Sequence, residues 1–139
     1  FLKSEEVSVN RHTAHALFED SSLSSNALNI FDAQFSINNC SFINTYSDAF
    51  DGDFVKGIVS NITFSEIGND AIDISGSRIE IDDIFVSSAG DKCISAGERS
   101  EITGKNIRLI NSELAVTSKD LSEVKFSKVF IESCKVGFT

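Results

Sequence analysis

The sequence predicts an all-β fold, a right-handed parallel β-helix (solenoid) of about six coils of 22–23 residues. Three observations predict it. Residue types recur in register every 22 positions, the recurring segments alternate as strands do, and turn-forming Asn and Asp separate them. Apolar spacings of three and four never persist long enough for a helix. A β-sandwich would contain many short strands, but it would not keep residue type in register along the chain.

Three adjacent columns carry the repeat without any slip. The first is small in every coil, the second is large and apolar, and the third is polar. In that order the columns are Ala27, Ala49, Ala71, Cys93, Ala115 and Gly137; Leu28, Phe50, Ile72, Ile94, Val116 and Phe138; and Asn29, Asp51, Asp73, Ser95, Thr117 and Thr139. Stacked coils explain the register, because equivalent side chains then lie about 4.8 Å apart. We expect the apolar column to be buried.

Two further strand slots complete each coil. One alternates apolar, exposed and apolar, and comprises Cys40-Ser41-Phe42, Ile62-Thr63-Phe64, Ile84-Phe85-Val86, Ile107-Arg108-Leu109 and Val129-Phe130-Ile131. The other comprises Phe35/Ile37, Gly57/Val59, Ile79/Ile81, Ile102/Gly104 and Val124/Phe126. The spacing becomes 23 between Val86 and Ile107 and returns to 22 by Ala115. This predicts a wider corner after Val86 and a compensating deletion before Ala115.

Corners and chain ends complete the organisation. Asn39, Asn61 and Asn106 stand between strand slots, and Asn tolerates the left-handed conformation that a sharp corner needs. Residues 1–26 match the columns poorly and form an irregular first coil or a junction, whereas residues 27–139 form the repeats. Because solenoid ends need covering, we expect a longer chain, with neighbouring domains or subunits at the uncapped ends.

Composition excludes several classes of function. The net charge of −9 argues against nucleic acid and anionic membrane surfaces as partners. A run of 18 apolar residues is absent, so no membrane insertion is expected. Cys40, Cys93 and Cys134 are expected to be buried free thiols. His12 and His15, three residues apart, would lie on opposite faces of a strand, so we expect no joint metal site.

Three segments resemble a known family. Asn44–Asp51, Gly68–Ile74 and Gly90–Ser95 are similar to coils of the right-handed parallel β-helix repeat proteins of the pectin-lyase-like superfamily. The resemblance implies a secreted or cell-surface location of bacterial type. It does not fix an activity, because such coils occur in lyases, hydrolases, epimerases and non-catalytic proteins.

The closest enzymatic similarity is to polygalacturonase-like glycoside hydrolases. Gly68-Asn69-Asp70 and Gly90-Asp91-Lys92-Cys93 resemble two of their motifs, one coil apart. Inverting hydrolysis needs paired carboxylates, yet Lys92 stands where the second carboxylate belongs. The later Gly-His-Gly and Arg-Ile-Lys motifs of that family are absent. We therefore do not expect polygalacturonase activity.

Stacked acidic residues are the remaining candidates for chemistry. Asp48 and Asp70 share a column with Lys92, and Asp51 and Asp73 share another. Two carboxylates about 5 Å apart repel by roughly 3 kcal/mol at an effective dielectric of 20. Three interpretations follow: solvated corner residues, a calcium site formed by the four aspartates, or a lyase site with Lys92 as base, as the resemblance implies. The catalytic candidates are Lys92, Asp91 and Asp70.

Two functions from different classes remain open. The first is a non-catalytic β-helix module of a larger extracellular or cell-surface protein, in contact with glycans such as an acidic polysaccharide. The alternative is a carbohydrate-active enzyme, a calcium-assisted polysaccharide lyase or a glycoside hydrolase, on the Asp-rich face. The missing catalytic motifs favour the first function, which requires no cofactor. Calcium is the ion that the four aspartates would bind. Tyr46 is the candidate for a sugar contact.

Overall fold

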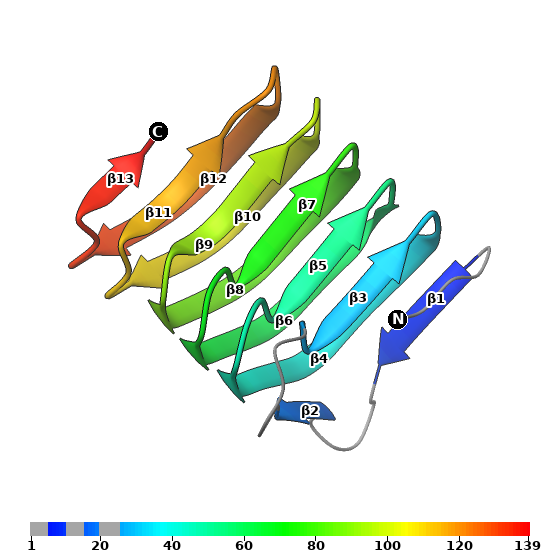
Figure 1. The fold of residues 1–139 in the computed structure, drawn as a ribbon, viewed down its shortest axis with the longest axis horizontal. Coiled ribbons are helices and arrows are strands. Elements are labelled where there is room, and N and C mark those ends of the chain that lie inside the picture. Colours follow the sequence, from blue (N-terminus) through cyan, green and yellow to red (C-terminus); the bar gives the residue numbers. More distant parts are fainter. Residues whose placement is uncertain (1–5, 11–15, 20–25) are drawn as a thin grey trace.

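The fold is a parallel β-solenoid. The structure, a computed structural model, describes residues 6–10, 16–19 and 26–139, which contain strands and turns but no helix. Six strands form one parallel sheet and seven form the other. The chain alternates between the sheets as it advances and winds in a right-handed sense (Figure 1). About five coils are present instead of six, because β13 begins a sixth coil without a following strand in the second sheet.

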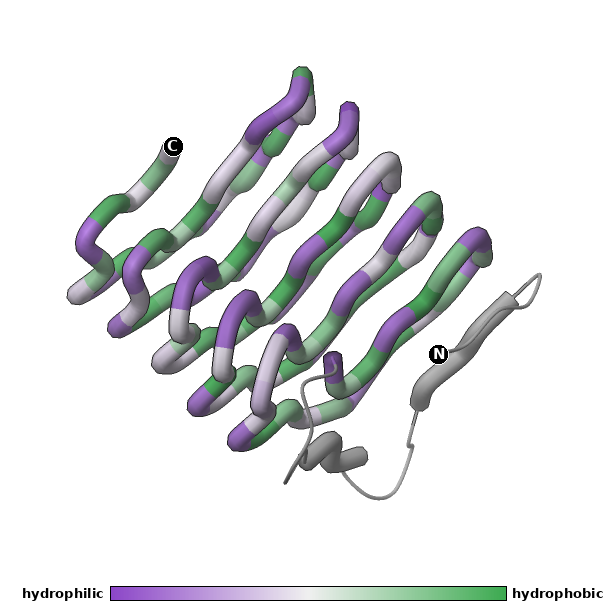
Figure 2. Tube along the Cα trace, in the orientation of Figure 1, coloured by the Kyte–Doolittle hydropathy of each residue, from purple (hydrophilic) through white to green (hydrophobic). Residues whose placement is uncertain are grey.

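The strands alternate between the two sheets along the chain. The first sheet contains β3 (Leu28–Phe31), β5 (Phe50–Asp53), β7 (Ile72–Ser75), β9 (Lys92–Gly97), β11 (Leu114–Ser118) and β13 (Val136–Phe138). The second contains β1 (Glu6–Asn10), β2 (Ala16–Glu19), β4 (Gln34–Thr45), β6 (Lys56–Ile67), β8 (Arg78–Ala89), β10 (Glu101–Ile110) and β12 (Glu123–Glu132). Hydrophilic segments recur at the turns of successive coils (Figure 2).

Each long strand of the second sheet spans two predicted strand slots. A residue with positive φ joins the slots, for example Asn39 (φ 54°), Asn61 (φ 51°) and Asn106 (φ 54°). The Asn61 side-chain amide donates to the Asn39 Oδ1 of the preceding coil. The sequence therefore located these corners correctly, although the strand continues through them.

Stacked apolar columns fill the interior. Phe50, Ile72, Ile94 and Val116 pair in register and are at most 2% exposed, as predicted. The second predicted column, Phe42, Phe64, Val86 and Leu109, is fully buried. The prediction is wrong at the last coil: Phe138 is 62% exposed, and Ile131 is only partly buried. No further coil covers these two side chains among the described residues.

The predicted insertion and deletion are confirmed. The pairing offset is 22 at Gly97, 23 from Glu101 to Ile110, and 22 again at Leu114. The extra residue therefore lies in the corner between β9 and β10, and the compensating deletion lies in the turn before β11.

Serine hydroxyls link the corners between the first and second sheets. The Ser77, Ser100 and Ser122 hydroxyl oxygens accept the backbone N–H groups of Val55, Ser77 and Ser100, at 2.9, 3.0 and 3.0 Å. This ladder satisfies backbone donors that a sharp corner would otherwise leave buried and unpaired.

Two of the three cysteines are buried as the repeat predicts, and the two N-terminal strands follow a different spacing from the repeat. Cys40 and Cys93 are buried free thiols, as expected, whereas Cys134 is only partly buried. Strands β1 and β2 both pair with β4, at offsets of 28 and 24 residues, so the segment before residue 27 follows a different spacing. No helix of the described residues is long and apolar enough to cross a membrane.

Candidate functional site

The predicted site residues gather where the chain returns from the second sheet to the first. Asp48 and Asp70 lie in the turns before β5 and β7, and Lys92 begins β9. The two aspartates are only 9% and 2% exposed. The interpretation as solvated corner residues is therefore wrong for both, because each carboxylate is covered by the next coil.

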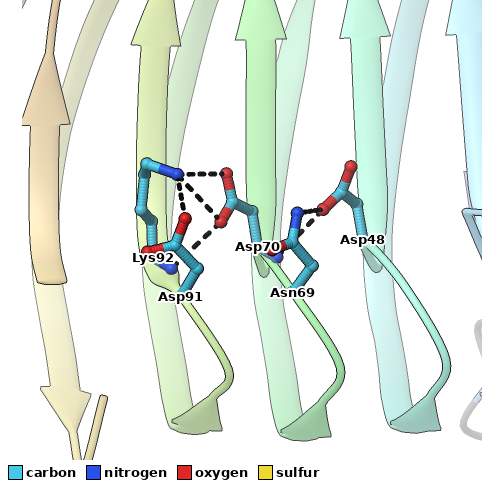
Figure 3. Close-up of polar contacts among 5 residues, drawn as sticks. All are labelled: Asp48, Asn69, Asp70, Asp91 and Lys92. Carbon is cyan, nitrogen blue, oxygen red and sulfur yellow. Dashed lines mark hydrogen bonds and ion pairs between the residues drawn. The ribbon is translucent and has the colours of Figure 1, made fainter. Parts of the chain in front are cut away.

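Asp48 and Asp70 cap the backbone of the coil that follows them (Figure 3). Asp48 Oδ1 accepts the backbone N–H of Asp70 at 2.9 Å and the Asn69 side-chain amide at 2.8 Å. Asp70 Oδ1 accepts the backbone N–H of Lys92 at 3.0 Å. These charge-assisted hydrogen bonds offset the repulsion expected between stacked carboxylates.

Lys92 is a counterion rather than a free base. Its ammonium lies 3.4 Å from Asp70 Oδ2 and also pairs with Asp91. Burial by itself would lower the pKa of Lys92, but the Asp91 and Asp70 carboxylates outweigh it and hold that pKa above its usual value. A lysine base must lose its proton near the working pH. The geometry therefore makes Lys92 a poor proton acceptor.

Asp70 and Asp91 share the Lys92 ammonium. Burial raises the pKa of Asp70 to about 6, although the Lys92 charge and its backbone N–H act in the opposite direction. The Asp91 side chain is 41% exposed and faces the same ammonium. Both carboxylates therefore neutralise one ammonium, an arrangement that accounts for their positions without a catalytic role.

The glycines of the family-like motifs have a packing role. A Cβ at Gly68 would lie 2.0 Å from the Tyr46 carbonyl oxygen, and a Cβ at Gly90 would lie 2.2 Å from the Gly68 carbonyl oxygen. The turns thus stack backbone against backbone. The Tyr46 side chain is 62% exposed, so its ring is accessible, as a sugar contact would require.

Asp51 and Asp73 form the second acidic pair. They are Cα partners in β5 and β7, as predicted, and both are partly buried. Asp51 Oδ2 accepts the side-chain amides of Asn26 and Asn29, at 2.6 and 2.7 Å. Burial, reinforced by the charges of Asp53 and neighbouring aspartates, raises the pKa of Asp51 to about 6. Burial also raises the pKa of Asp73.

The four aspartates lie close enough for their charges to raise the pKa values of Asp51 and Asp70. Within the part of the chain that the structure describes, no group of three or more His, Cys, Asp or Glu side chains is placed to hold a metal ion. Carboxylate oxygens of Asp48 and Asp51 are engaged by N–H donors, which a cation would have to displace. Calcium binding here stays a prediction. His12 and His15 lie outside the described residues.

These raised pKa values predict a pH dependence of stability. The folded chain holds the Asp51 and Asp70 protons more tightly than the unfolded chain, whose aspartates titrate near 4. The stabilisation is complete below about pH 4 and is lost as the pH rises through about 6. We therefore expect these two carboxylates to make the thermal midpoint higher at about pH 5 than at about pH 7.5.

Asp51→Asn isolates this effect. At about pH 7.5 it should raise the free energy of unfolding by about 1–2 kcal/mol. This is less than the roughly 2.7 kcal/mol that corresponds to a rise of the Asp51 pKa from about 4 to about 6, because solvent screens the site in part. The control Asp83→Asn removes the same charge from an exposed corner. Urea titrations at both pH values measure the difference; a gain at Asp51 no larger than at Asp83 would contradict the prediction.

A groove that the sequence did not indicate lies at the opposite corner of the coils. It has a volume of about 630 Å³ and follows the turns from the first sheet to the second over four coils. We call it the corner groove; its lining includes Asp32, Phe54, Lys56, Gly76, Arg78 and Arg99. The 22-residue spacing of Lys56 and Arg78 was the only sequence signal for it.

Comparison with known proteins gives no match to a family model, a curated protein or a solved structure. The parallel β-solenoid is therefore established by the structure itself.

Proposed function

We propose that this chain is a non-catalytic β-helix module of the pectin-lyase-like type, part of a larger extracellular or cell-surface protein, and that it contacts an acidic glycan. The main support is that the residues resembling a catalytic motif stabilise the stacking of the coils. Asp48, Asp70 and Lys92 hold successive coils together, and Gly68 and Gly90 give their turns room to stack. Each therefore has a structural reason to be present.

Exposed apolar side chains and an uncovered strand edge support the proposal of a larger assembly. Phe130 and Phe138 are 50% and 62% exposed, and Leu121 is 82% exposed. The strand β12 is an edge strand of its sheet. Uncovered strand edges and exposed apolar side chains favour association, and a β-coil of a partner stacked on β12 and β13 would cover them.

An activity assay tests the proposal. Incubation with polygalacturonate, with and without calcium, should produce neither unsaturated ends nor new reducing ends. Lys92→Met should instead lower the free energy of unfolding by about 3 kcal/mol, because it leaves the buried Asp70 carboxylate without its cation. Either product formed by the unaltered chain would contradict the proposal. Unsaturated ends that disappear in a Lys92→Met variant shown to be folded would favour the lyase.

A further inference from the structure

The corner groove concentrates positive charge on an acidic protein. The chain has 12 Lys and Arg against 21 Asp and Glu, yet three cationic side chains and only one carboxylate, that of Asp32, line this groove. Lys56 and Arg78 are Cα partners in β6 and β8. Lys56 and Arg99 form no ion pair within residues 26–139, and Arg78 uses one guanidinium nitrogen on Glu101, at 2.8 Å. Donors for an anion thus remain available.

Phe54 gives the groove an aromatic wall. Its side chain is 55% exposed, and its backbone has a φ of 53°, a conformation that is costly for a bulky residue. The ring meets Phe31 edge-on at a centroid distance of 5.8 Å. It also lies over Gly76, where a Cβ would come within 2.7 Å of the ring. Positive φ recurs at the equivalent position of the other coils, at Asp32, Gly76, Glu98 and Asp120, so this conformation belongs to the corner itself. What Phe54 adds to the corner is a half-exposed aromatic ring beside the cations of the groove.

We infer that the corner groove binds an anionic glycan chain that lies along the solenoid axis. This inference rests on the proposed function, because it gives the non-catalytic module its binding site. Lys56, Arg78 and Arg99 would pair with carboxylate or sulfate groups. The exposed face of Phe54 would pack against the apolar face of a sugar ring.

The direction of the ligand follows from the stacking. Successive coils lie about 4.8 Å apart, and Lys56 and Arg78 occupy neighbouring coils at the same position. A ligand with negative groups repeated along the axis can therefore meet one cation after another. Phe54 lies two residues before Lys56, so the aromatic ring and the cations face the same stretch of ligand.

A peptide fits the groove less well than a glycan. Peptides that add to a sheet need free backbone N–H and C=O groups. Here the backbone along the corner is already paired between coils: Lys56 N–H donates to Ala33 O, and Arg78 N–H donates to Val55 O. The groove therefore contacts a ligand through side chains alone. Such contacts suit a glycan, which presents charged groups and the flat faces of its sugar rings.

Affinity electrophoresis and calorimetry on the full chain test the inference. The probes are polygalacturonate for carboxylates, dextran sulfate for sulfates, neutral dextran as the uncharged control and poly-L-glutamate as an acidic peptide. The groove variant is Lys56→Gln/Arg78→Gln/Arg99→Gln. Its charge-matched control, Lys105→Gln/Lys125→Gln/Lys135→Gln, removes three exposed cations outside the groove.

We expect the unaltered chain to bind at least one anionic glycan and not neutral dextran. The groove variant should bind about tenfold or more weakly, and the control variant should change by less than about twofold. Binding should disappear at about 1 M salt, where the screening length is about 3 Å. The double variant Lys56→Gln/Arg99→Gln, which breaks no ion pair, should show the same direction of change.

Phe54→Asn tests the aromatic wall separately. Asparagine tolerates a positive φ, so the thermal midpoint should stay equal or rise, while glycan binding weakens by about fivefold. Several outcomes would overturn the inference: no binding to either anionic glycan, equal loss in the groove and control variants, or groove-dependent binding of poly-L-glutamate alone. Cleavage of polygalacturonate would instead overturn the proposed function and leave the groove measurements standing.

Discussion

Replacing Phe64 by alanine is expected to lower the free energy of unfolding by about 3–5 kcal/mol. The side chain is fully buried, and its ring stacks on Phe42 at a centroid distance of 5.0 Å. Neighbouring coils lie on both sides of it, so the space left by the ring cannot close easily. Urea unfolding followed by circular dichroism measures the change.

Phe138→Ala is the matched control for that experiment. Phe138 is 62% exposed, so the same truncation should cost less than about 1 kcal/mol. A loss as large as that of Phe64→Ala would show that Phe138 is covered in solution. A concentration-dependent loss would identify the cover as a second copy of the chain, in place of a neighbouring domain.

Gly90→Ala is expected to destabilise the fold strongly, although it adds only one methyl group. The new Cβ would lie 2.2 Å from the Gly68 carbonyl oxygen and 2.9 Å from its carbonyl carbon. These are backbone atoms of the preceding turn, held by the hydrogen bond from Gly90 N–H to Ile67 O at 2.9 Å. Relief requires moving one coil against another, so we expect a loss of about 3 kcal/mol or more.

Gly137→Ala controls for the change of glycine to alanine itself. A Cβ at Gly137 would meet nothing within 4 Å, so its effect should stay within about 0.5 kcal/mol. Thermal and urea unfolding of both variants provide the comparison. If Gly90→Ala unfolds like the unaltered chain, the close stacking of the turns is wrong, and the glycine of the family-like motif would need a functional explanation.

The sequence by itself determined the solenoid. The column Phe50, Ile72, Ile94 and Val116 is buried and in register as predicted. Alternation along a strand fixes which side chains face inward, and a constant period means that each coil presents the same face to the next. Even the one-residue insertion could be located, because the strands on either side of it pair in register with the adjacent coil.

The roles of the polar residues were decided only by the tertiary structure. The column of Asp48, Asp70 and Lys92 was visible in the sequence, but their burial was not. A polar residue at a corner can face solvent or turn toward the next coil, and the backbone path of the turn determines which. Here the carboxylates accept N–H groups of the following coil that would otherwise lack a partner. The free energy gained by these hydrogen bonds outweighs the hydration that the carboxylates lose on burial.

The corner groove and the last coil depended on tertiary structure in the same way. The groove joins side chains from the turns of several coils, and one of its columns changes from Phe54 to Gly76. Lys56 and Arg78 share a position, but that one pair does not mark a groove in the sequence. Phe138 matches its column as well as Phe50 does, yet one is exposed and the other buried. A repeat specifies what each coil offers its neighbours; burial also requires that a neighbour be present on both sides.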